Sequence, residues 1–509
     1  MVQYGAALWL TRWHWRSVDP AVADTHVEPI SRLFPGLSFE ATWDRLNVVQ
    51  DPTYGSLYRS YLCLFPFSGV DSFGNGGLDL RVFREVWPGY TVFPDFTLER
   101  AQAWWAERVA EFAAQGPDAA WLDMNDPSTG QVDCNAMLFD EGRAAHDAYH
   151  NQYASLMAEA SYRGFLKARP GIRPFLLSRS GYTGDQKFTA HWTGDNWSNY
   201  HHLHMSIGKC INLALSGMAF IGPDVPGFGG KVKEGLFIDW YKAGFLFPFF
   251  RNHSMHTSGR QEPWVFSAEA MSIARRYIRL RYKLLPHLYN LFIRHSETGE
   301  AVMRPLFYDF ADSKRLPLAH VSDQFMIGPW IMQAPFTVEG QAEREIALPA
   351  ARWWRGDQGA WVSGPSRPVA RKEAGSTPLF LREGAIIPML RGIPKDNRKD
   401  LRDVELLIVL SKEFNGKAES RYVCDDGETF DYLKGVRSAY RLEAEVHKDR
   451  LTLRIHAESE AFGPVVFTPV TVERFAEVVL EGPEGARPLA PRAVASDAWG
   501  TGTTFYHWS

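Results

Sequence analysis

The strongest constraint on the fold of this sequence is the alternation of short apolar runs with longer helical stretches between Thr97 and Phe310. Short apolar runs with polar ends are typical of buried strands, and long amphipathic stretches closed by Gly or Pro are typical of helices. Strands that alternate with helices favour a parallel sheet, because a parallel pair needs a long crossover connection. The region is therefore predicted to be an α/β domain made of repeated βα units.

The expected elements of this domain can be read directly from the pattern. The strands are Ala119–Met124, Pro174–Ser178, Thr189–Trp192, Ala219–Gly222 and Ala301–Leu306, and the helices are Leu98–Ala114, Glu141–Ala168, Tyr200–Leu215 and Ser267–Ile293.

The pattern changes beyond about Asp323, where short apolar runs are broken by Gly, Pro and charged turns. This texture is typical of antiparallel β-structure, and a change of composition near Pro394–Asp403 separates two such regions. Two β-sandwich-like domains are therefore predicted. The expected strands are Phe325–Met332, Arg344–Leu348, Pro378–Arg382, Glu405–Leu410, Ser420–Cys424 and Arg450–Ile455.

Composition excludes two classes of partner. The net charge is −4 and acidic residues are interleaved with basic ones, so no basic stripe for nucleic acid is predicted. The longest apolar stretches, Ile211–Gly222 and Ala243–Phe250, are shorter than the ~20 residues that span a bilayer. We therefore expect neither nucleic acid nor a membrane as a partner.

Two carboxylates stand at the ends of expected strands. Asp123 follows the apolar run that begins at Ala119, and Asp195 closes the segment that begins at His191. In parallel α/β barrels the chemistry lies at the carboxyl ends of the strands, and a pair of carboxylates is what glycoside hydrolysis needs. The alternative for each Asp is a helix cap or a turn, which is our interpretation of Asp126.

The residues around both carboxylates resemble glycoside hydrolase family 31, the α-glucosidase and α-xylosidase family. Trp121–Asn125 (WLDMN) resembles the nucleophile signature of the family, with Asp126 where the common form has Glu. Ser178–Asn196 resembles the acid/base segment, in which Arg179 precedes Asp195 by sixteen residues. Further matches follow in family order: Val86–Gly89, Phe93–Thr97, Ser216–Phe228, Phe249–Ser254, Arg281–Pro286, Met303–Leu306, Leu381–Pro388 and Asp425–Thr429.

This resemblance implies a role for each carboxylate. Asp123 would be the nucleophile and Asp195 the general acid/base of a retaining mechanism, with their carboxyl groups ~5–6 Å apart. The Arg179 guanidinium would favour the charged form of Asp123. A dry environment between Trp192 and Trp197, together with the charge of Asp123, would raise the pKa of Asp195.

Other residues match family positions that bind or enclose the sugar. Arg179 and His253 would bind hydroxyl groups, Trp121, Trp192 and Phe228 would form pocket walls, Met124 one edge, Asp224 a support, and Trp87 a further part of the pocket. For the aromatic residues the alternative is ordinary packing, and for His253 it is a histidine with all its hydrogen bonds satisfied.

The implied fold is a (β/α)8 TIM-type barrel over residues 1–320, divergent over 1–84, followed by a proximal β domain at 321–398 and a distal β domain at 399–509. The implied function is retaining hydrolysis of terminal non-reducing α-glucosidic bonds in oligosaccharides or other α-glycosides. An α-transglucosylase, an α-xylosidase and an inactive carbohydrate-binding fragment are the alternatives on this scaffold.

The start of the chain departs from the family pattern. Only 118 residues precede Ala119, and neither the N-terminal β-sandwich nor the sugar-binding Asp-x-Asp segment is found in Met1–Arg84. Either the branch diverges here or the chain is a fragment or altered gene model, and we expect the latter. Met1–Ser17 carries no visible secretion signal, which favours a cytoplasmic location. The sequence leaves the oligomeric state open.

No metal or cofactor is expected. His201, His202 and His204 are interpreted as the start of a helix with imidazoles facing solvent, because they lack the spacing of a zinc motif. Gly227–Gly230 lacks the strand–turn–helix context of a dinucleotide loop. Buried thiols, rather than zinc ligands or disulfides, are expected at Cys63, Cys134, Cys210 and Cys424.

Overall fold

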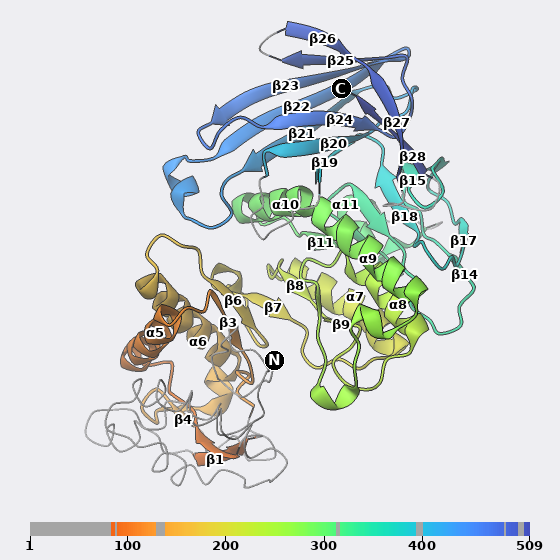
Figure 1. Cartoon of the computed structure of the whole chain (residues 1–509). Helices are drawn as coiled ribbons and strands as arrows, with labels where there is room; N and C mark the ends of the chain where they lie inside the picture. Colours follow the sequence, from red (N-terminus) through yellow and green to blue (C-terminus); the bar gives the residue numbers. More distant parts are fainter. Residues whose placement is uncertain are drawn as a thin grey trace. The chain divides into compact units, whose positions relative to one another are not determined.

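The computed structural model describes residues 83–86, 89–128, 138–311, 316–392, 401–482, 485–496 and 503–508. The chain divides into two compact units, Met1–Trp192 and Thr193–Ser509 (Figure 1). Among the described helices, none combines the length and the apolar character that crossing a bilayer requires.

The first unit contains a parallel sheet whose strands alternate with helices. β3 (Ala119–Leu122), β6 (Phe175–Ser178) and β7 (Ala190–Trp192) are neighbours in that order, and both pairs are parallel. α5 (Glu99–Ala114) precedes β3, and α6 (His146–Ala168) precedes β6. The predicted βα alternation is confirmed here, although α6 begins five residues later than the expected Glu141.

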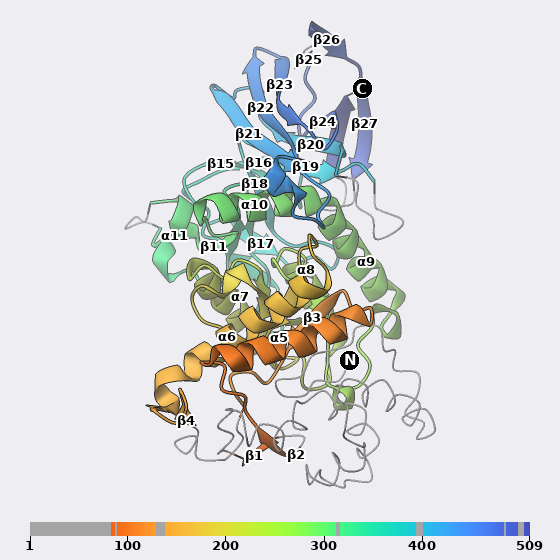
Figure 2. The ribbon, with the colours of Figure 1, turned by 90° about the vertical axis from the view of Figure 1, so that its left-hand side faces the viewer.

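α5 and α6 pack side by side, as Figure 2 shows. Gly164 permits this close approach, because a Cβ atom at that position would lie 2.5 Å from Val109 Cβ and 2.7 Å from the backbone oxygen of Ala106. Across the same interface the indole of Trp105 donates a hydrogen bond to Ser161 Oγ at 2.8 Å. The helix pair therefore covers the strands as a fixed layer.

Short elements complete the described part of the first unit. They are the antiparallel pair β1 (Phe83–Val86) and β2 (Gly89–Val92), the antiparallel pair β4 (Leu138–Phe139) and β5 (Ala144–Ala145), and the 3-10 turn η3 (Asp185–Lys187).

The second unit begins with a helical region. Asn199 caps α7 (Tyr200–Leu215), since its side chain accepts a hydrogen bond from the backbone N–H of His202 at 2.8 Å. Next come β8 (Ile221–Gly222), β9 (Asp224–Val225), α8 (Glu234–Gly244) and β10 (Arg251–Asn252), which pairs in parallel with β9. The 3-10 turns η4 (His256–Ser258) and η5 (Pro263–Val265) follow β10.

The helix expected at Ser267–Ile293 is wrong as a single element. The structure has α9 (Ala268–Lys283) and α10 (Leu285–Thr298), with Leu284 between them. Pro286 explains the break, because proline cannot supply a backbone N–H within a helix but fits its first turn.

An antiparallel sheet of six strands follows the helices. Its order is β11 (Met303–Arg304), β12 (Phe325–Ile327), β13 (Ile331–Gln333), β18 (Leu379–Arg382), β15 (Arg352–Arg355) and β16 (Ala360–Ser363). The strand expected at Ala301–Leu306 as part of the parallel series is therefore corrected, because β11 pairs antiparallel with β12. The expected strand Phe325–Met332 is two strands, β12 and β13.

The C-terminal part of the second unit is a β-sandwich, drawn at the top of Figure 1. One sheet has the order β19 (Ala385–Leu390), β20 (Asp403–Val409), β24 (Val466–Thr471), β28 (Thr503–Trp508) and β27 (Pro491–Ser496). The other has the order β21 (Lys417–Cys424), β22 (Ser438–His447), β23 (Arg450–Glu460), β25 (Glu477–Gly482) and β26 (Gly485–Leu489).

A common apolar core joins these two sheets. It contains Leu406 and Trp508 from the first sheet and Tyr422 and Leu453 from the second, all of them buried. Between the helices and the sandwich, the small elements are α11 (Leu306–Asp309), η6 (Leu318–His320) and the antiparallel pair β14 (Glu343–Glu345) and β17 (Val369–Arg371). The 3-10 turn η7 (Asp431–Lys434) connects β21 to β22 within the sandwich.

Two of the four cysteines can be compared with the prediction. Cys210 and Cys424 are buried free thiols, as expected. Cys63 and Cys134 lie outside the described residues.

Candidate active site

Asp123 lies where the buried strand β3 ends. Its side chain is 1% exposed, and one carboxylate oxygen, Oδ1, accepts a hydrogen bond from the backbone N–H of Met124 at 2.8 Å. Met124 has a φ angle of 57°, in the left-handed region that costs a side-chain-bearing residue free energy. The chain thus turns sharply after Asp123, and its carboxylate is held at the carboxyl edge of the sheet, as the sequence predicts.

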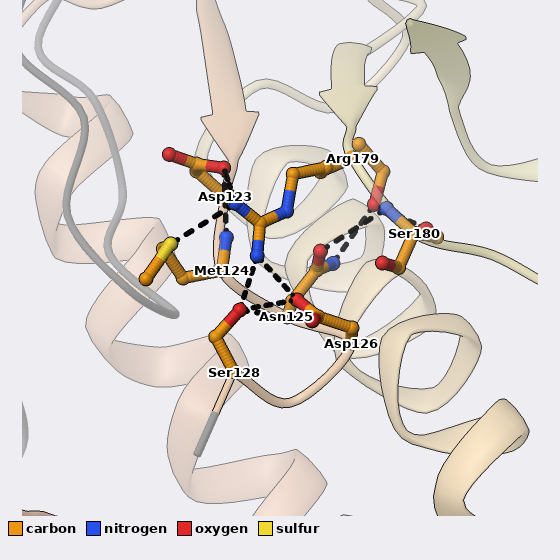
Figure 3. Close-up of polar contacts among 8 residues, drawn as sticks. Asp123, Met124, Asn125, Asp126, Ser128, Arg179 and Ser180 are labelled. Atoms are coloured by element: carbon orange, nitrogen blue, oxygen red, sulfur yellow. Dashed lines mark hydrogen bonds and ion pairs between the residues drawn. The ribbon is translucent and has the colours of Figure 1, made fainter. Parts of the chain in front are cut away.

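Arg179 follows the neighbouring strand β6 and reaches Asp123 (Figure 3). Its Nη1 atom lies 3.5 Å from Asp123 Oδ1 and donates to Met124 Sδ at 3.0 Å. The backbone N–H of Arg179 donates to the carbonyl oxygen of Leu122 at 3.0 Å, which fixes the end of β6 against the end of β3. The predicted proximity of Arg179 and Asp123 is therefore present in the structure.

Two residues anchor the second guanidinium nitrogen of Arg179. The sequence did not predict this role for either of them. Nη2 donates to Asp126 Oδ1 at 2.6 Å and to the hydroxyl of Ser128, and that hydroxyl donates in turn to Asp126 at 2.7 Å. Asp126 thus forms a turn with Ser128, as a cap would, and also pairs with Arg179. Burial would raise the pKa of Asp126, but the charge and hydrogen bond of Arg179 lower it below its ordinary value.

Asn125 connects the two strand ends beneath this ion pair. It is completely buried, its amide donates to Ser178 Oγ at 2.8 Å, and its carbonyl oxygen accepts from the backbone N–H of Ser180 at 3.3 Å. The contact with Ser180 is visible in Figure 3. Because a buried amide without partners would be costly, the network fixes the backbone on which Asp123 and Arg179 stand.

Trp121 and Trp192 lie in the interior of the first unit. Their rings pack edge to face with centroids 5.1 Å apart, and both side chains are almost completely buried. This contact joins β3 to β7 at the end of the sheet where Asp123 lies. A role as pocket walls stays a prediction for both residues. Trp87 lies outside the described residues.

In the second unit, Asp195 lies in the loop before α7. Its neighbour Asn196 is buried and anchors the loop, because its amide donates to the carbonyl oxygen of Asp224 at 2.8 Å. The sequence led us to expect a dry environment between Trp192 and Trp197, but Asp195 and Trp197 are both exposed. The short polar loop leaves them at the surface, while Asn196 points inward.

Asp224 forms a buried ion pair close to this loop. Its Oδ1 atom accepts from Arg251 Nε at 2.7 Å, because the parallel pairing of β9 with β10 places the two residues opposite each other. Complete burial raises the pKa of Asp224 to about 6, opposed by the charge of Arg251 and supported by the negative charge of Asp195. The backbone carbonyl of Asp224 contacts the loop that carries Asp195 through Asn196, and a role of Asp224 as a support for the site stays a prediction.

His253 and Phe228 pack against each other. Their rings stack with centroids 5.4 Å apart and an interplanar angle of 25°. The backbone N–H of His253 donates to the carbonyl oxygen of Val225 at 3.1 Å. Burial, together with the positive charge of Arg251, lowers the pKa of His253 to about 2, so its imidazole is neutral and can donate one hydrogen bond and accept another.

The three histidines at the start of α7 have structural contacts. His201 is exposed and its ring contacts that of His202 at 5.7 Å. His204 Nδ1 lies 3.2 Å from Thr337 Oγ1, within hydrogen-bond distance. Within the described ranges, no group of three or more His, Cys, Asp or Glu side chains is arranged to hold a metal ion.

Comparison with protein families identifies two consecutive domains. The model for the glycosyl hydrolases family 31 TIM-barrel domain matches residues 73–291, and the model for the family 31 C-terminal domain matches residues 299–387. These matches include the segments that carry Asp123, Arg179, Asp195 and His253.

Curated relatives agree with this assignment. Alpha-glucosidase 2 of Bacillus thermoamyloliquefaciens is 37% identical over 426 residues, covering 81% of this chain and 52% of the relative. Lysosomal alpha-glucosidase of Bos taurus is 34% identical over 402 residues, covering 69% of this chain and 42% of the relative. The chain thus spans about half the length of the curated relatives that it matches.

Solved structures agree on the fold. A family 31 dextranase of Flavobacterium johnsoniae, complexed with glucose, matches with a TM-score of 0.74 and 21% identity over 86% of this chain and 58% of that chain. A family 31 alpha-xylosidase of Xanthomonas citri matches with a TM-score of 0.69 and 23% identity over 83% of this chain and 47% of that chain. The expected TIM-barrel domain followed by β-structure is confirmed, and the chain belongs to glycoside hydrolase family 31.

Proposed function

We propose that this protein is a retaining α-glycosidase that hydrolyses terminal non-reducing α-glucosidic bonds of oligosaccharides. The observation that carries the proposal is the buried Asp123 at the end of β3, with the Arg179 guanidinium 3.5 Å from its Oδ1 atom. A nearby positive charge favours the ionised carboxylate that a nucleophile must be. The names of the α-glucosidase relatives support the choice of sugar.

The reaction has two steps. In the first, the Asp123 carboxylate attacks the anomeric carbon, the bond to the leaving oxygen breaks, and that oxygen takes the proton of Asp195. In the second, water gives a proton to Asp195 and its oxygen displaces Asp123, which releases a sugar with the α configuration. This exchange of roles requires the two carboxyl groups to lie ~5–6 Å apart in the working enzyme.

The remaining site residues are assigned to binding. The Arg179 guanidinium and the neutral His253 imidazole would donate hydrogen bonds to sugar hydroxyls, which strengthen as the ring flattens in the transition state. Phe228, Trp121 and Trp192 would shape the pocket, and Met124 would form one edge. Asp224 would support the loop of Asp195 through its contact with Asn196. Trp87 and the domain limits 320/321 and 398/399 remain predictions.

The second candidate function is that of an α-xylosidase, because a family 31 α-xylosidase is among the solved structures that this chain resembles. The two functions share the mechanism and differ in the space around C6 of the sugar. Transfer of the glucosyl unit to a sugar acceptor is a variation of the same second step. A carbohydrate-binding protein without turnover would lack both steps.

One experiment separates these possibilities. Proton NMR should follow the sugar released from a nitrophenyl α-glucoside and from the matching α-xyloside, each at equal concentration. We expect the α-glucoside to be cleaved faster and the α anomer to be present before mutarotation. Release of the β anomer first would contradict the retaining mechanism. Faster cleavage of the xyloside would favour the second function, and no cleavage of either would favour the binding protein.

A further inference from the structure

We propose that Trp197 is the stacking platform for the leaving-group sugar, the part of the substrate beyond the bond that is broken. This inference rests on the proposed function, because it assumes that Asp195 protonates the oxygen that joins the two sugars. Trp197 follows Asp195 by two positions in the same loop, and both residues are exposed. The residues of the proposed mechanism contact the sugar on the other side of that bond.

Trp197 and Asp195 both reach solvent from the same loop. Asn196 is 4% exposed and points into the protein, whereas Asp195 and Trp197 on either side of it are exposed. Asp195 lies at a bend of the loop, and Trp197 follows it by two residues at an isolated β-bridge. Both residues are therefore open to solvent, on either side of an inward-facing Asn196.

One face of the indole is fixed by two glycines. A Cβ atom on Gly229 would lie 3.3 Å from Cδ2 and Cε2 of Trp197, and a Cβ atom on Gly230 would lie 2.9 Å from its Cε3 atom. A side chain at either position would push the ring away. The absence of side chains at both positions thus lets the ring lie flat against the backbone.

Backbone hydrogen bonds hold this arrangement. Trp197 and Gly229 form a parallel β-bridge, the N–H of Ser198 donates to the carbonyl oxygen of Gly229 at 2.8 Å, and the N–H of Gly229 donates to that of Asn196 at 2.9 Å. The loop of Asp195 is thereby tied to the loop of Phe228. The indole is therefore preorganised rather than free to swing.

The other side of the indole is available to a ligand. Trp197 is 56% exposed, although a large apolar ring at the surface would ordinarily lower its free energy by packing inward. A rigid indole that presents an apolar face and a polar N–H edge suits the C–H face and the hydroxyl rim of a pyranose. The chemical class expected there is a sugar ring, either the leaving group or an acceptor for transfer.

The test compares substrates with and without a leaving-group ring. The chain is assayed with maltose and with α-glucosyl fluoride, whose leaving group is a single atom. For Trp197→Ala we expect kcat/KM to fall about tenfold for maltose, which corresponds to about 1.4 kcal/mol, and to stay within about twofold for the fluoride, which has no ring to stack on the indole. Trp197→Phe should restore most of the maltose activity. Phe307→Ala, which removes an exposed aromatic ring from α11, is the matched control.

The failures of the two proposals can be told apart. Suppose that the unaltered chain cleaves α-glucosyl fluoride. If Trp197→Ala then lowers kcat/KM equally for both substrates, or for neither, the assignment of Trp197 as a stacking platform is contradicted. If the unaltered chain cleaves neither, the proposed function fails. The affinity for maltose, measured by calorimetry in the Asp123→Asn variant, then tests the role of Trp197 separately. Loss of about tenfold in affinity on adding Trp197→Ala supports it, and unchanged affinity overturns it.

Discussion

Arg179 donates a hydrogen bond from Nη2 to Asp126 Oδ1 at 2.6 Å, so the guanidinium beside the candidate nucleophile is anchored by a second carboxylate. Asp126 is a short residue at a position where the family signature commonly has Glu. The anchor leaves the other guanidinium nitrogen near Asp123, at 3.5 Å. The orientation of Arg179 therefore depends on the turn that follows β3.

Removing this anchor should weaken catalysis without abolishing it. We expect Asp126→Asn to lower kcat/KM for an aryl α-glucoside about fivefold, because a partly exposed charge-assisted hydrogen bond contributes ~1 kcal/mol after solvent screening. Steady-state kinetics measures the effect. Asp126→Glu, which keeps the charge, should retain more activity than Asp126→Asn. A smaller loss in Asp126→Asn than in Asp126→Glu would show that side-chain length, rather than charge, positions Arg179.

Replacement of the acid/base residue should have different effects on the two steps. Asp195→Asn should release a burst of nitrophenol from a dinitrophenyl α-glucoside at nearly the native rate, because this leaving group needs no proton. The following steady state should be slower by ~10²–10⁴, since water loses its general base. Stopped-flow absorbance measures both phases. A burst slowed as much as the steady state would argue against the assigned role.

Acid should destabilise the protein partly through His287, a buried histidine on α10. Burial lowers its pKa to about 4, partly opposed by a hydrogen bond to the backbone of Ile327. Because the folded pKa is below the unfolded value of about 6.5, the neutral residue stabilises the fold above pH 6.5, and this contribution is lost as pH falls toward 4. The shift corresponds to about 3 kcal/mol of unfolding free energy.

Denaturant unfolding at several pH values tests this account. The amide of His287→Asn can replace the hydrogen-bond donor to Ile327. Between pH 7 and pH 4, the free energy of unfolding of this variant should fall by about 3 kcal/mol less than that of the unaltered chain. His201→Asn, which removes an exposed imidazole, is the matched control and should behave like the unaltered chain. An identical pH dependence in His287→Asn would contradict the burial of a neutral imidazole.

Local patterns predicted the elements that local forces determine. The expected helix Tyr200–Leu215 has the observed bounds, because its cap and its apolar periodicity lie within the segment itself. The same holds for Asp123 at the end of β3 and Arg179 at the end of β6, where a polar residue follows a buried run. The sequence could thus predict the site residues that share a loop or a strand pair within one unit.

Features that depend on distant partners were not accessible. Nothing near Met303 in the sequence indicates that β11 pairs antiparallel with β12 rather than joining the parallel series. The anchoring of Arg179 by Asp126 and Ser128 requires the turn after Asp123 to bring side chains together across 51 to 53 positions of the chain. Asn125 belongs to the segment Trp121–Asn125, but only the contact with Ser178 shows that it joins the ends of two strands.

The most direct test of the central claim is nitrophenol release from an aryl α-glucoside by the purified 509-residue protein and by its Asp123→Asn variant. The proposed mechanism predicts turnover by the unaltered protein and its loss, for any leaving group, in the variant, because no nucleophile remains to attack the anomeric carbon. Circular dichroism should show that both proteins are folded. Equal turnover by the two proteins, or none by the folded unaltered protein, would contradict the assignment of Asp123 as the nucleophile of a working glycosidase.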